Sequence, residues 1–169
     1  MVRVGEFEKV SYEEFHRSMK DMNGDYPDYW IKEIYDNIKL PKRATSGSAG
    51  YDFYAPHAIT LAPGETIKIA TGIRVKIEEG WVLLVFPRSG LGFKYRMQLN
   101  NTVGVIDSDY YYSDNEGHIF AKITNDSNED KTIDIQAGQG IMQGIFMPFG
   151  LTYSDYTDGV RNGGLGSTT

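Results

Sequence analysis

The chain has 169 residues, with 17 lysines and arginines against 23 aspartates and glutamates, and no cysteine. A disulfide scaffold, a thiolate zinc site and a cysteine nucleophile are therefore excluded. The net charge of −6 argues against binding of a nucleic-acid backbone, and no apolar stretch reaches the roughly 20 residues of a membrane span. We expect a cytoplasmic protein that binds neither nucleic acid nor membrane.

The first 40 residues favour short helices. The sequence Ser11-Tyr12-Glu13-Glu14 has the form of a capping box, and Pro27 suits the start of a second helix. The apolar residues at helical spacing are Tyr12, Phe15, Met19 and Met22, followed by Trp30, Ile31, Ile34, Tyr35 and Ile38. We predict that residues 1–39 form a helical extension with two short amphipathic helices.

From residue 40 to residue 152 the pattern changes to short strands. Apolar and polar residues alternate over 67–70 and 73–77, and Trp81–Phe86 is a continuous apolar run typical of a buried strand. Further candidates are 119–123, 131–135 and 141–147. This spacing predicts an all-β core, built as an antiparallel, jelly-roll-like sandwich or barrel. Residues 153–169 contain little apolar surface, and we expect a flexible tail.

Common hydrolase motifs are missing from the sequence. No GxSxG, HExxH or Walker A pattern occurs, and His16, His57 and His118 are too scattered to suggest a catalytic triad or a metal site. The segments that can carry chemistry are instead short and rich in glycine or polar residues. They are residues 48–52, 87–92, 101–110, 138–143 and 161–168.

The segment Pro87-Arg88-Ser89-Gly90-Leu91-Gly92 follows the continuous apolar strand. A loop that combines a guanidinium, a hydroxyl and a glycine-rich backbone can direct donors at a phosphate, although Arg-Ser-Gly also forms ordinary turns. The tail repeats this combination at 161–168. A Gly-rich tail of this kind either closes over a phosphorylated ligand or is a plain exposed terminus.

The segment from Asn101 to Tyr110 is an apolar strand pattern interrupted by Gly104. Glycine within a strand often marks the close approach of a ligand or of neighbouring backbone. Asp107 ends the strand pattern, where a carboxylate can act as a base at the rim of a cleft, or can belong to a polar turn. The remaining segments each offer one polar side chain at a strand, Asp52 and Gln143.

In this order and spacing, the five segments resemble the motifs of the trimeric dUTP pyrophosphatases (dUTP diphosphatases, or dUTPases). The resemblance covers about residues 40–169, and PRSGLG at 87–92 and GVIDSDY at 104–110 are its most specific parts. It implies a jelly-roll-like β-sandwich that forms a homotrimer with shared active sites. The implied reaction is Mg²⁺-assisted attack of water on the α-phosphorus of dUTP, which gives dUMP and pyrophosphate and keeps uracil out of DNA.

The resemblance also implies roles for single residues. Asp107 would deprotonate the attacking water, Tyr110 would lie against the deoxyribose, and Asp52 would contact Mg²⁺ through water. The uracil would be read by Asn101, Gly104, Val105 and Ile106. The phosphates would be held by Arg88, Ser89, Gly90 and Gln143, and a tail swapped from a neighbouring chain would contribute Arg161, Leu165, Gly166, Ser167 and Thr168.

The chain departs from the family pattern at three places. Leu165 stands where an aromatic residue usually stacks on uracil, the tail is one residue shorter, and the turn after Tyr110 is expanded over 111–117. Residues 1–39 lie outside the common core. They are either an addition to the trimer surface or a module that binds a protein partner.

Two other functions stay open. A dCTP deaminase has the same fold, but it usually needs a glutamate in a Thr-Leu-Glu sequence, and this sequence does not occur here. A regulatory member of the family would bind nucleotide and a protein partner. The presence of Asp107, Arg88 and Arg161 argues against a loss of catalysis.

Overall fold

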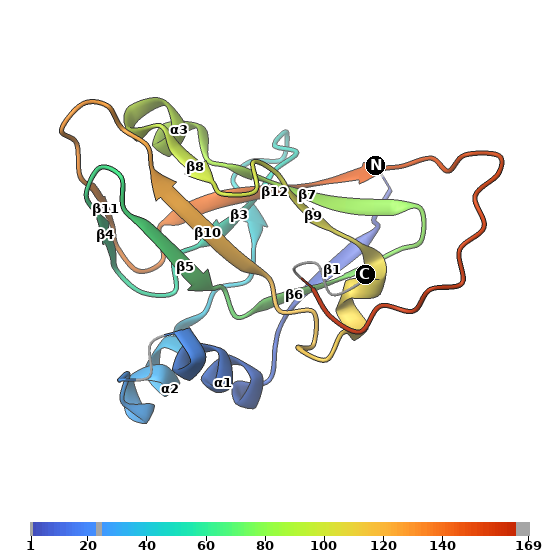
Figure 1. Ribbon diagram of the computed structural model, residues 1–169, viewed down its shortest axis with the longest axis horizontal. Helices are drawn as coiled ribbons and strands as arrows, with labels where there is room; N and C mark the ends of the chain where they lie inside the picture. The colour runs from blue at the N-terminus through green and yellow to red at the C-terminus, as the bar shows by residue number, and fades with distance from the viewer. Residues whose placement is uncertain (1, 23–24, 165–169) are drawn as a thin grey trace.

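The structure is a computed structural model that describes residues 2–22 and 25–164 (Figure 1). Strands dominate it, and helices are few. The helices are α1 (Tyr12–Met22), α2 (Asp28–Asn37), α3 (Ser89–Tyr95) and the 3-10 helix η1 (Ser108–Tyr112). The strands are β1 (Gly5–Lys9), β2 (Lys42–Arg43), β3 (Tyr51–Tyr54), β4 (Ile59–Leu61), β5 (Thr66–Ala70), β6 (Ile73–Ile77), β7 (Trp81–Pro87), β8 (Met97–Leu99), β9 (Gly104–Ile106), β10 (Phe120–Asn125), β11 (Ile133–Ile135) and β12 (Gly140–Pro148).

The strands of the described residues pair in antiparallel fashion throughout. The largest sheet has the order β2-β3-β12-β7-β9, and smaller sheets are formed by β5-β10-β8, β1-β6 and β11-β4. Strand β7 lies between β12 and β9, and its continuous apolar run fits its burial pattern, because side chains on both of its faces are buried or half-buried. Val82, Leu83 and Val85 on this strand are all buried.

The core follows from the period-two pattern that the sequence shows. On β6, Ile73, Val75 and Ile77 are buried, whereas Lys76 between them is exposed. Apolar side chains from the large and the small sheets meet in one buried cluster. Burial of each such side chain contributes about 1.5–3 kcal/mol to the free energy of folding.

Strand β1 was missed in the sequence. It pairs with β6 and places Phe7 opposite Val75, where the Phe7 ring packs edge-on against Phe53 with centroids 5.6 Å apart. A Cβ on Gly5 would lie 2.7 Å from the ring of Phe146, so glycine permits this close approach. Five residues with a single large apolar side chain are too short to show a strand period.

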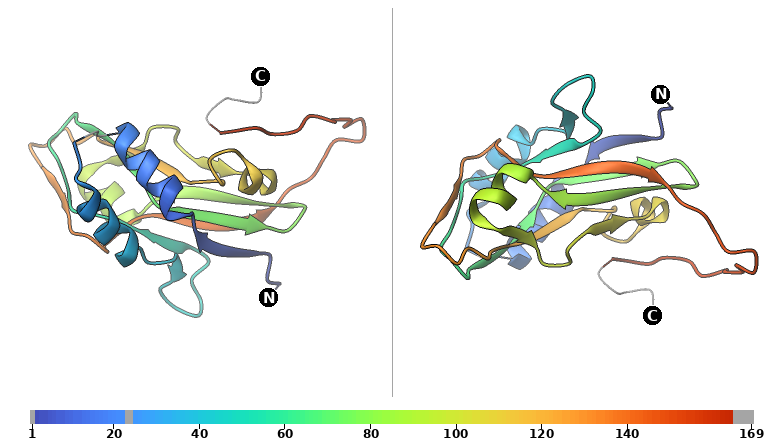
Figure 2. Two further views of the ribbon diagram at one scale, coloured as in Figure 1. Left: turned by 90° about the horizontal axis from the view of Figure 1, so that it is seen from below. Right: turned by 90° about the horizontal axis from the view of Figure 1, so that it is seen from above.

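Helices α1 and α2 lie together at one end of the β core (Figures 1 and 2). Phe15 and Met19 of α1, Ile31 and Ile34 of α2 and Ala70 of β5 share one buried cluster. Both helices fall within the stretch that the apolar spacing predicts to be helical. In the described part of the chain, no helix is long and apolar enough to cross a membrane.

The capping box at the start of α1 forms only in part. The Ser11 Oγ accepts a hydrogen bond from the Glu14 N–H at 3.1 Å, as predicted. The Ser11 N–H, however, donates to Oε2 of Glu116 at 2.8 Å. Glu14 instead turns inward, and its Oε1 lies 3.1 Å from Nδ1 of the fully buried His118. In a capping box, one glutamate donates its N–H to the N-cap side chain and accepts the N-cap N–H with its carboxylate. Here Glu14 does the first and the distant Glu116 does the second.

The buried pair affects the acid–base properties of both groups. Burial lowers the pKa of His118 below its ordinary value of 6.5, although Glu14 and Glu116 oppose the shift and Lys68 adds to it. Burial raises the pKa of Glu14, but hydrogen bonds from His118 and Ser18 outweigh it, so that this pKa lies below 4.5. In the unfolded chain both groups take up protons at higher pH than in the folded protein.

We therefore expect the protein to lose stability as pH falls below about 6.5. The contribution of His118 to the free energy of unfolding is fully present above 6.5, its pKa in the unfolded chain, and declines as the pH falls below this value. The contribution of Glu14 to the same free energy declines as the pH falls below 4.5. Urea midpoints between about pH 7.5 and 5.5, with NMR titration of the His118 ring, measure the effect. A folded-state pKa at or above 6.5, or a constant midpoint, would contradict this expectation.

Residues 89–95 form helix α3, where the sequence suggested a loop. Leu91 and Tyr95, one helical turn apart, pack against the main core and favour this conformation. The helix ends at Arg96, which has a left-handed φ of 52°. Ser89 and Gly90 therefore lie in the first turn of a short helix rather than in a free loop.

The chain leaves the sheet at the end of β12 and forms a long irregular arm (Figure 2). In both figures this arm projects from the body and then returns toward η1. Large apolar residues along it, including Leu151, Tyr153 and Tyr156, are exposed. The arm is therefore held mainly where it returns to the body, around Arg161.

Candidate active site

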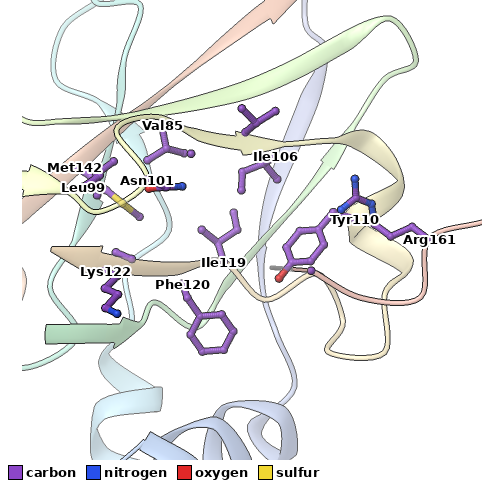
Figure 3. Close-up of a pocket in the computed structure, with 14 residues that line it drawn as sticks. Val85, Leu99, Asn101, Ile106, Tyr110, Ile119, Phe120, Lys122, Met142 and Arg161 are labelled. Carbon is purple, nitrogen blue, oxygen red and sulfur yellow. The ribbon is translucent and has the colours of Figure 1, made fainter. Parts of the chain in front are cut away.

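A pocket of about 120 Å³ lies beside the edge strand β9 (Figure 3). Its other walls come from β7, β8, β10, β12, η1 and the returning arm. The lining includes these residues singled out in the sequence: Asn101, Gly104, Val105, Ile106, Tyr110 and Arg161. Segments from Val85 to Gly164 thus meet in one place.

Strand β9 offers the pocket backbone polar groups, and Asn101, which precedes this strand, offers a side-chain amide. Within the described residues it pairs with β7 alone, with Gly104 opposite Val85. A strand at a sheet edge leaves part of its N–H and C=O groups without ladder partners. A Cβ on Gly104 would lie 3.2 Å from the Val85 Cβ and 3.9 Å from Nδ2 of Asn101. The amide of Asn101 therefore stands close to this edge backbone, and together they suit a planar polar ligand.

Asp107 follows β9 directly and lies at the start of η1. The Arg161 guanidinium joins two carboxylates there: its Nη2 donates to Oδ2 of Asp107 at 2.5 Å, and its Nε donates to Oδ1 of Asp109 at 2.8 Å. The side chain of Asp107 is 43% exposed and that of Arg161 is 20% exposed. The acid is thus open to solvent and next to a cation that also reaches the pocket.

Tyr110 forms a fixed wall of the pocket. Its hydroxyl donates to the backbone oxygen of His118 at 2.7 Å and accepts from Nδ2 of Asn115 at 2.8 Å. Burial raises the pKa of Tyr110 above its ordinary value of 10.0, so the phenol stays neutral. The Arg161 guanidinium lies 5.9 Å from the ring centroid, and a Cβ on Gly164 would lie 2.7 Å from Cε2 of Tyr110. The arm therefore packs directly on this ring.

Asp52, Arg88 and Gln143 form a second polar cluster. Asp52 on β3 is the cross-strand neighbour of Gln143 on β12, and Nε of Arg88 lies 3.2 Å from Oδ1 of Asp52. Ser89 and Gly90, both exposed, follow Arg88 at the start of α3. This cluster combines one carboxylate, one guanidinium and one amide, a set of groups that suits a phosphate chain with its counter-ion.

Glycines make room for this second cluster. A Cβ on Gly140 would lie 2.5 Å from Nη1 of Arg88, and a Cβ on Gly50 would lie 2.5 Å from Oε1 of Gln143. The glycines of segments 48–52 and 138–143 thus allow the backbone to approach these side chains closely. A larger residue at either position would displace the group that it contacts.

The structure does not bring all predicted residues together in one chain. Within the described residues, no hydrogen bond or ion pair joins the cluster around Asp107 to the cluster around Arg88. Leu165, Gly166, Ser167 and Thr168 lie outside the described residues. Sequence reasoning missed Asn115 and His118, which hold Tyr110, and Lys122, which lines the pocket. No local pattern marks them, because their partners are set by tertiary contacts.

The family model of the dUTPases matches residues 36–168 of this chain. The chain belongs to the dUTPase family. The deoxyuridine 5'-triphosphate nucleotidohydrolase of Lactococcus lactis is 42% identical to it over 134 residues, which cover 78% of this chain and 88% of the relative. The family match thus contains every one of the five motif segments.

Solved dUTPase structures have a similar fold. The crystal structure of the dUTPase from Streptococcus mutans superposes with a TM-score of 0.63 at 37% identity, covering 86% of this chain and 97% of that one. The dUTPase from phage phi11 of S. aureus, described with a structural Mg(II) ion, has a TM-score of 0.63 at 19% identity and covers 92% and 97%. The second likeness concerns the fold alone, and both agree with a mostly β architecture.

Proposed function

We propose that this chain hydrolyses dUTP to dUMP and pyrophosphate. The observation that carries the proposal is the solvent-accessible carboxylate of Asp107, which directly follows Ile106 of the pocket wall and is paired with the pocket-lining Arg161. A water molecule held by Asp107 attacks the α-phosphorus, and the bond to the bridging oxygen of the β-phosphate breaks. Asp107 takes up the proton of the water, and pyrophosphate leaves.

The pocket supplies groups for base and sugar recognition. The Asn101 amide and the backbone of Gly104–Ile106 offer donors and acceptors of the kind that the edge of uracil requires. A cytosine ring presents a different pattern and would leave buried polar groups unpaired. The Tyr110 ring, held by hydrogen bonds at its hydroxyl, closes the sugar side and leaves no room for a 2′-hydroxyl.

The phosphate chain requires cationic groups from both clusters. Arg88 and Gln143, with Ser89 and Gly90 beside them, would hold one part of the triphosphate, and Arg161 would close on its far end. Arg161 must then exchange its carboxylate partners for phosphate oxygens, which is favourable because a triphosphate carries more negative charge. The tail residues Leu165, Gly166, Ser167 and Thr168 are proposed to complete this closure.

The residues also fit a magnesium ion that arrives with the triphosphate. The described residues hold no group of three or more histidine or carboxylate side chains that could enclose a metal. Mg²⁺ commonly keeps several waters and takes most of its other ligands from substrate phosphates. Asp52, half-buried beside Arg88, would hold such waters. The bound ion would neutralise charge on the phosphates, while Asp107 and the arginines perform the steps described above.

We further propose a homotrimer with shared sites. Two polar clusters that remain separate in one chain support this assembly, because each holds only part of the required groups. The exposed apolar arm, with Phe149, Leu151, Tyr153 and Tyr156, also needs a partner surface. In this arrangement the β core is a jelly-roll-like sandwich, and the two N-terminal helices are an addition to it that can face a protein partner. A cytoplasmic location stays a prediction.

Selective cleavage of dUTP tests the proposed function. With Mg²⁺ present, we expect dUTP to yield dUMP and pyrophosphate, with dCTP, dTTP and UTP cleaved at least about 100-fold more slowly as judged by kcat/KM. Pyrophosphate release measured for each nucleotide separately provides these values. Cleavage of dCTP or UTP at rates similar to dUTP would refute the assignment of uracil and sugar recognition to this pocket.

A further inference from the structure

Tyr110 is attached to a part of the molecule that the reaction itself does not use. Its hydroxyl donates to the main-chain oxygen of His118, and its position is therefore tied to that residue. The second partner of the hydroxyl, Asn115, belongs to the expanded turn at 111–117. The wall that we assign to sugar recognition is thus fixed through its hydroxyl, by residues that do not contact the reacting phosphate.

His118 is itself held from two directions. Its Nε2 accepts a hydrogen bond from the Gly72 N–H at 2.9 Å, so the neutral ring carries its proton on Nδ1. Nδ1 faces Oε1 of Glu14 at 3.1 Å and Oγ of Ser18 at 3.3 Å. Both Glu14 and Ser18 lie on α1 and are buried. The ring of His118 thus links helix α1 to the β5–β6 turn.

The expanded turn is attached to the same helix. Glu116 accepts hydrogen bonds from the Ser11 N–H at 2.8 Å and from the Ser11 hydroxyl at 2.6 Å, at the start of α1. Arg74 of β6 lies 3.7 Å from the same carboxylate. Helix α1 therefore contacts the segment that carries Tyr110 at two points, through Glu116 with Ser11 just before the helix and through His118 with Glu14 and Ser18 in its first half.

We propose that helix α1 is a specificity-determining element, in which Glu14 and His118 act as positioning residues for Tyr110 and thereby for the rejection of ribonucleotides. The inference rests on the proposed dUTPase activity, but it assigns a role to the N-terminal segment outside the common core. Loss of the Glu14 contact would let the 118–119 backbone and the Tyr110 ring move outward. UTP would then enter more easily, whereas Asp107 and the arginines would remain in place.

The ratio of kcat/KM for dUTP to that for UTP tests this role. We expect Glu14→Ala to lower the ratio about ten-fold, mainly by raising the value for UTP, because a small displacement of a positioned group has effects of this size. Glu14→Gln keeps an acceptor for the His118 Nδ1–H and should retain the wild-type ratio. The matched control is Met19→Ala, which removes another buried side chain of α1 that makes no polar contact with His118. It should lower the melting temperature without changing the ratio.

A double-mutant cycle with Tyr110→Phe tests whether helix α1 acts through the hydroxyl of Tyr110. If α1 acts through the Tyr110 hydroxyl, Glu14→Ala should have little further effect on the ratio in the Tyr110→Phe background. Glu116→Ala, at a partly exposed site, is a milder variant in case Glu14→Ala does not fold, and it should give a smaller fall. An unchanged ratio in every variant that folds, or an equal fall in Met19→Ala, would overturn the inference alone. A wild-type protein that fails to hydrolyse dUTP would overturn the proposed function as well.

Discussion

Replacing Asp107 with asparagine should reduce kcat for dUTP by at least about 100-fold, with little change in substrate binding. Asparagine preserves the shape of the side chain and can still contact Arg161, but it cannot accept a proton from water. The remaining activity would come from the phosphate contacts and from orientation of the substrate. Steady-state kinetics, together with calorimetric binding of a non-hydrolysable dUTP analogue, separates kcat from affinity.

Asp109 offers a matched control for this experiment. It lies two positions along the same segment, and it pairs with the same arginine at 2.8 Å. Asp109→Asn makes the same change in charge and removes one partner of Arg161, but it leaves the proposed base in place. We expect a loss of no more than about ten-fold. Equal losses in the two variants would mean that Asp107 serves to hold Arg161 and is not the base.

The sequence predicts those parts of the fold that depend on local pattern. The alternation over residues 73–77 corresponds to β6, because burial on one face requires apolar residues at every second position. The apolar run at 81–86 corresponds to β7, because burial on both faces requires apolar residues at consecutive positions. The helical spacing before residue 40 corresponds to α1 and α2, because burial on one face of a helix requires apolar residues three or four positions apart. Strand β1 and helix α3 were missed, because each is short and is stabilised mainly by packing on the core.

The candidate site shows the same division between local and long-range information. The motif at 104–110 identifies Asp107 and Tyr110 because strand, acid and aromatic residue are adjacent in the chain. It does not reveal that Arg161 pairs with Asp107 across 54 positions. The contact of Glu14 with His118 spans 104 positions, and nothing near either residue predicts it. Such pairs form only when helix α1 docks on the β core.

The proposed positioning role of α1 gives the buried Glu14–His118 pair a function besides stability. A well-packed apolar pair at the same place could be equally stable, because burial of polar groups is costly. The polar pair instead fixes the direction of the His118 ring and, with it, the main-chain oxygen that holds Tyr110. Protonation of His118 in acid, which removes the Nε2 acceptor of the Gly72 N–H, should therefore reduce both stability and the selection against ribonucleotides.

Truncation before Arg161 should leave the fold nearly intact and cost at least about 100-fold in activity. Of the residues that this truncation removes, the described ones, 161–164, are one arginine, one asparagine and two glycines, so they bury little apolar side-chain surface. The ion pairs of Arg161 with Asp107 and Asp109 involve carboxylates that are about half exposed, and pairs of this kind contribute about 1 kcal/mol or less. Melting temperature measures the stability of the fold, light scattering measures the oligomeric state, and dUTP turnover measures the activity.

Point variants separate the charge of Arg161 from its geometry. The guanidinium reaches two carboxylates at once through Nη2 and Nε, and the same fork can bind two phosphate oxygens. Arg161→Lys keeps the charge without the fork and should recover only part of the activity lost in Arg161→Ala. Lys32→Ala removes one positive charge from an exposed pair on α2 and should retain full activity. If Arg161→Ala hydrolysed dUTP as fast as the wild type, the arm would have no part in the site, and Arg161 would serve only to hold the arm against η1.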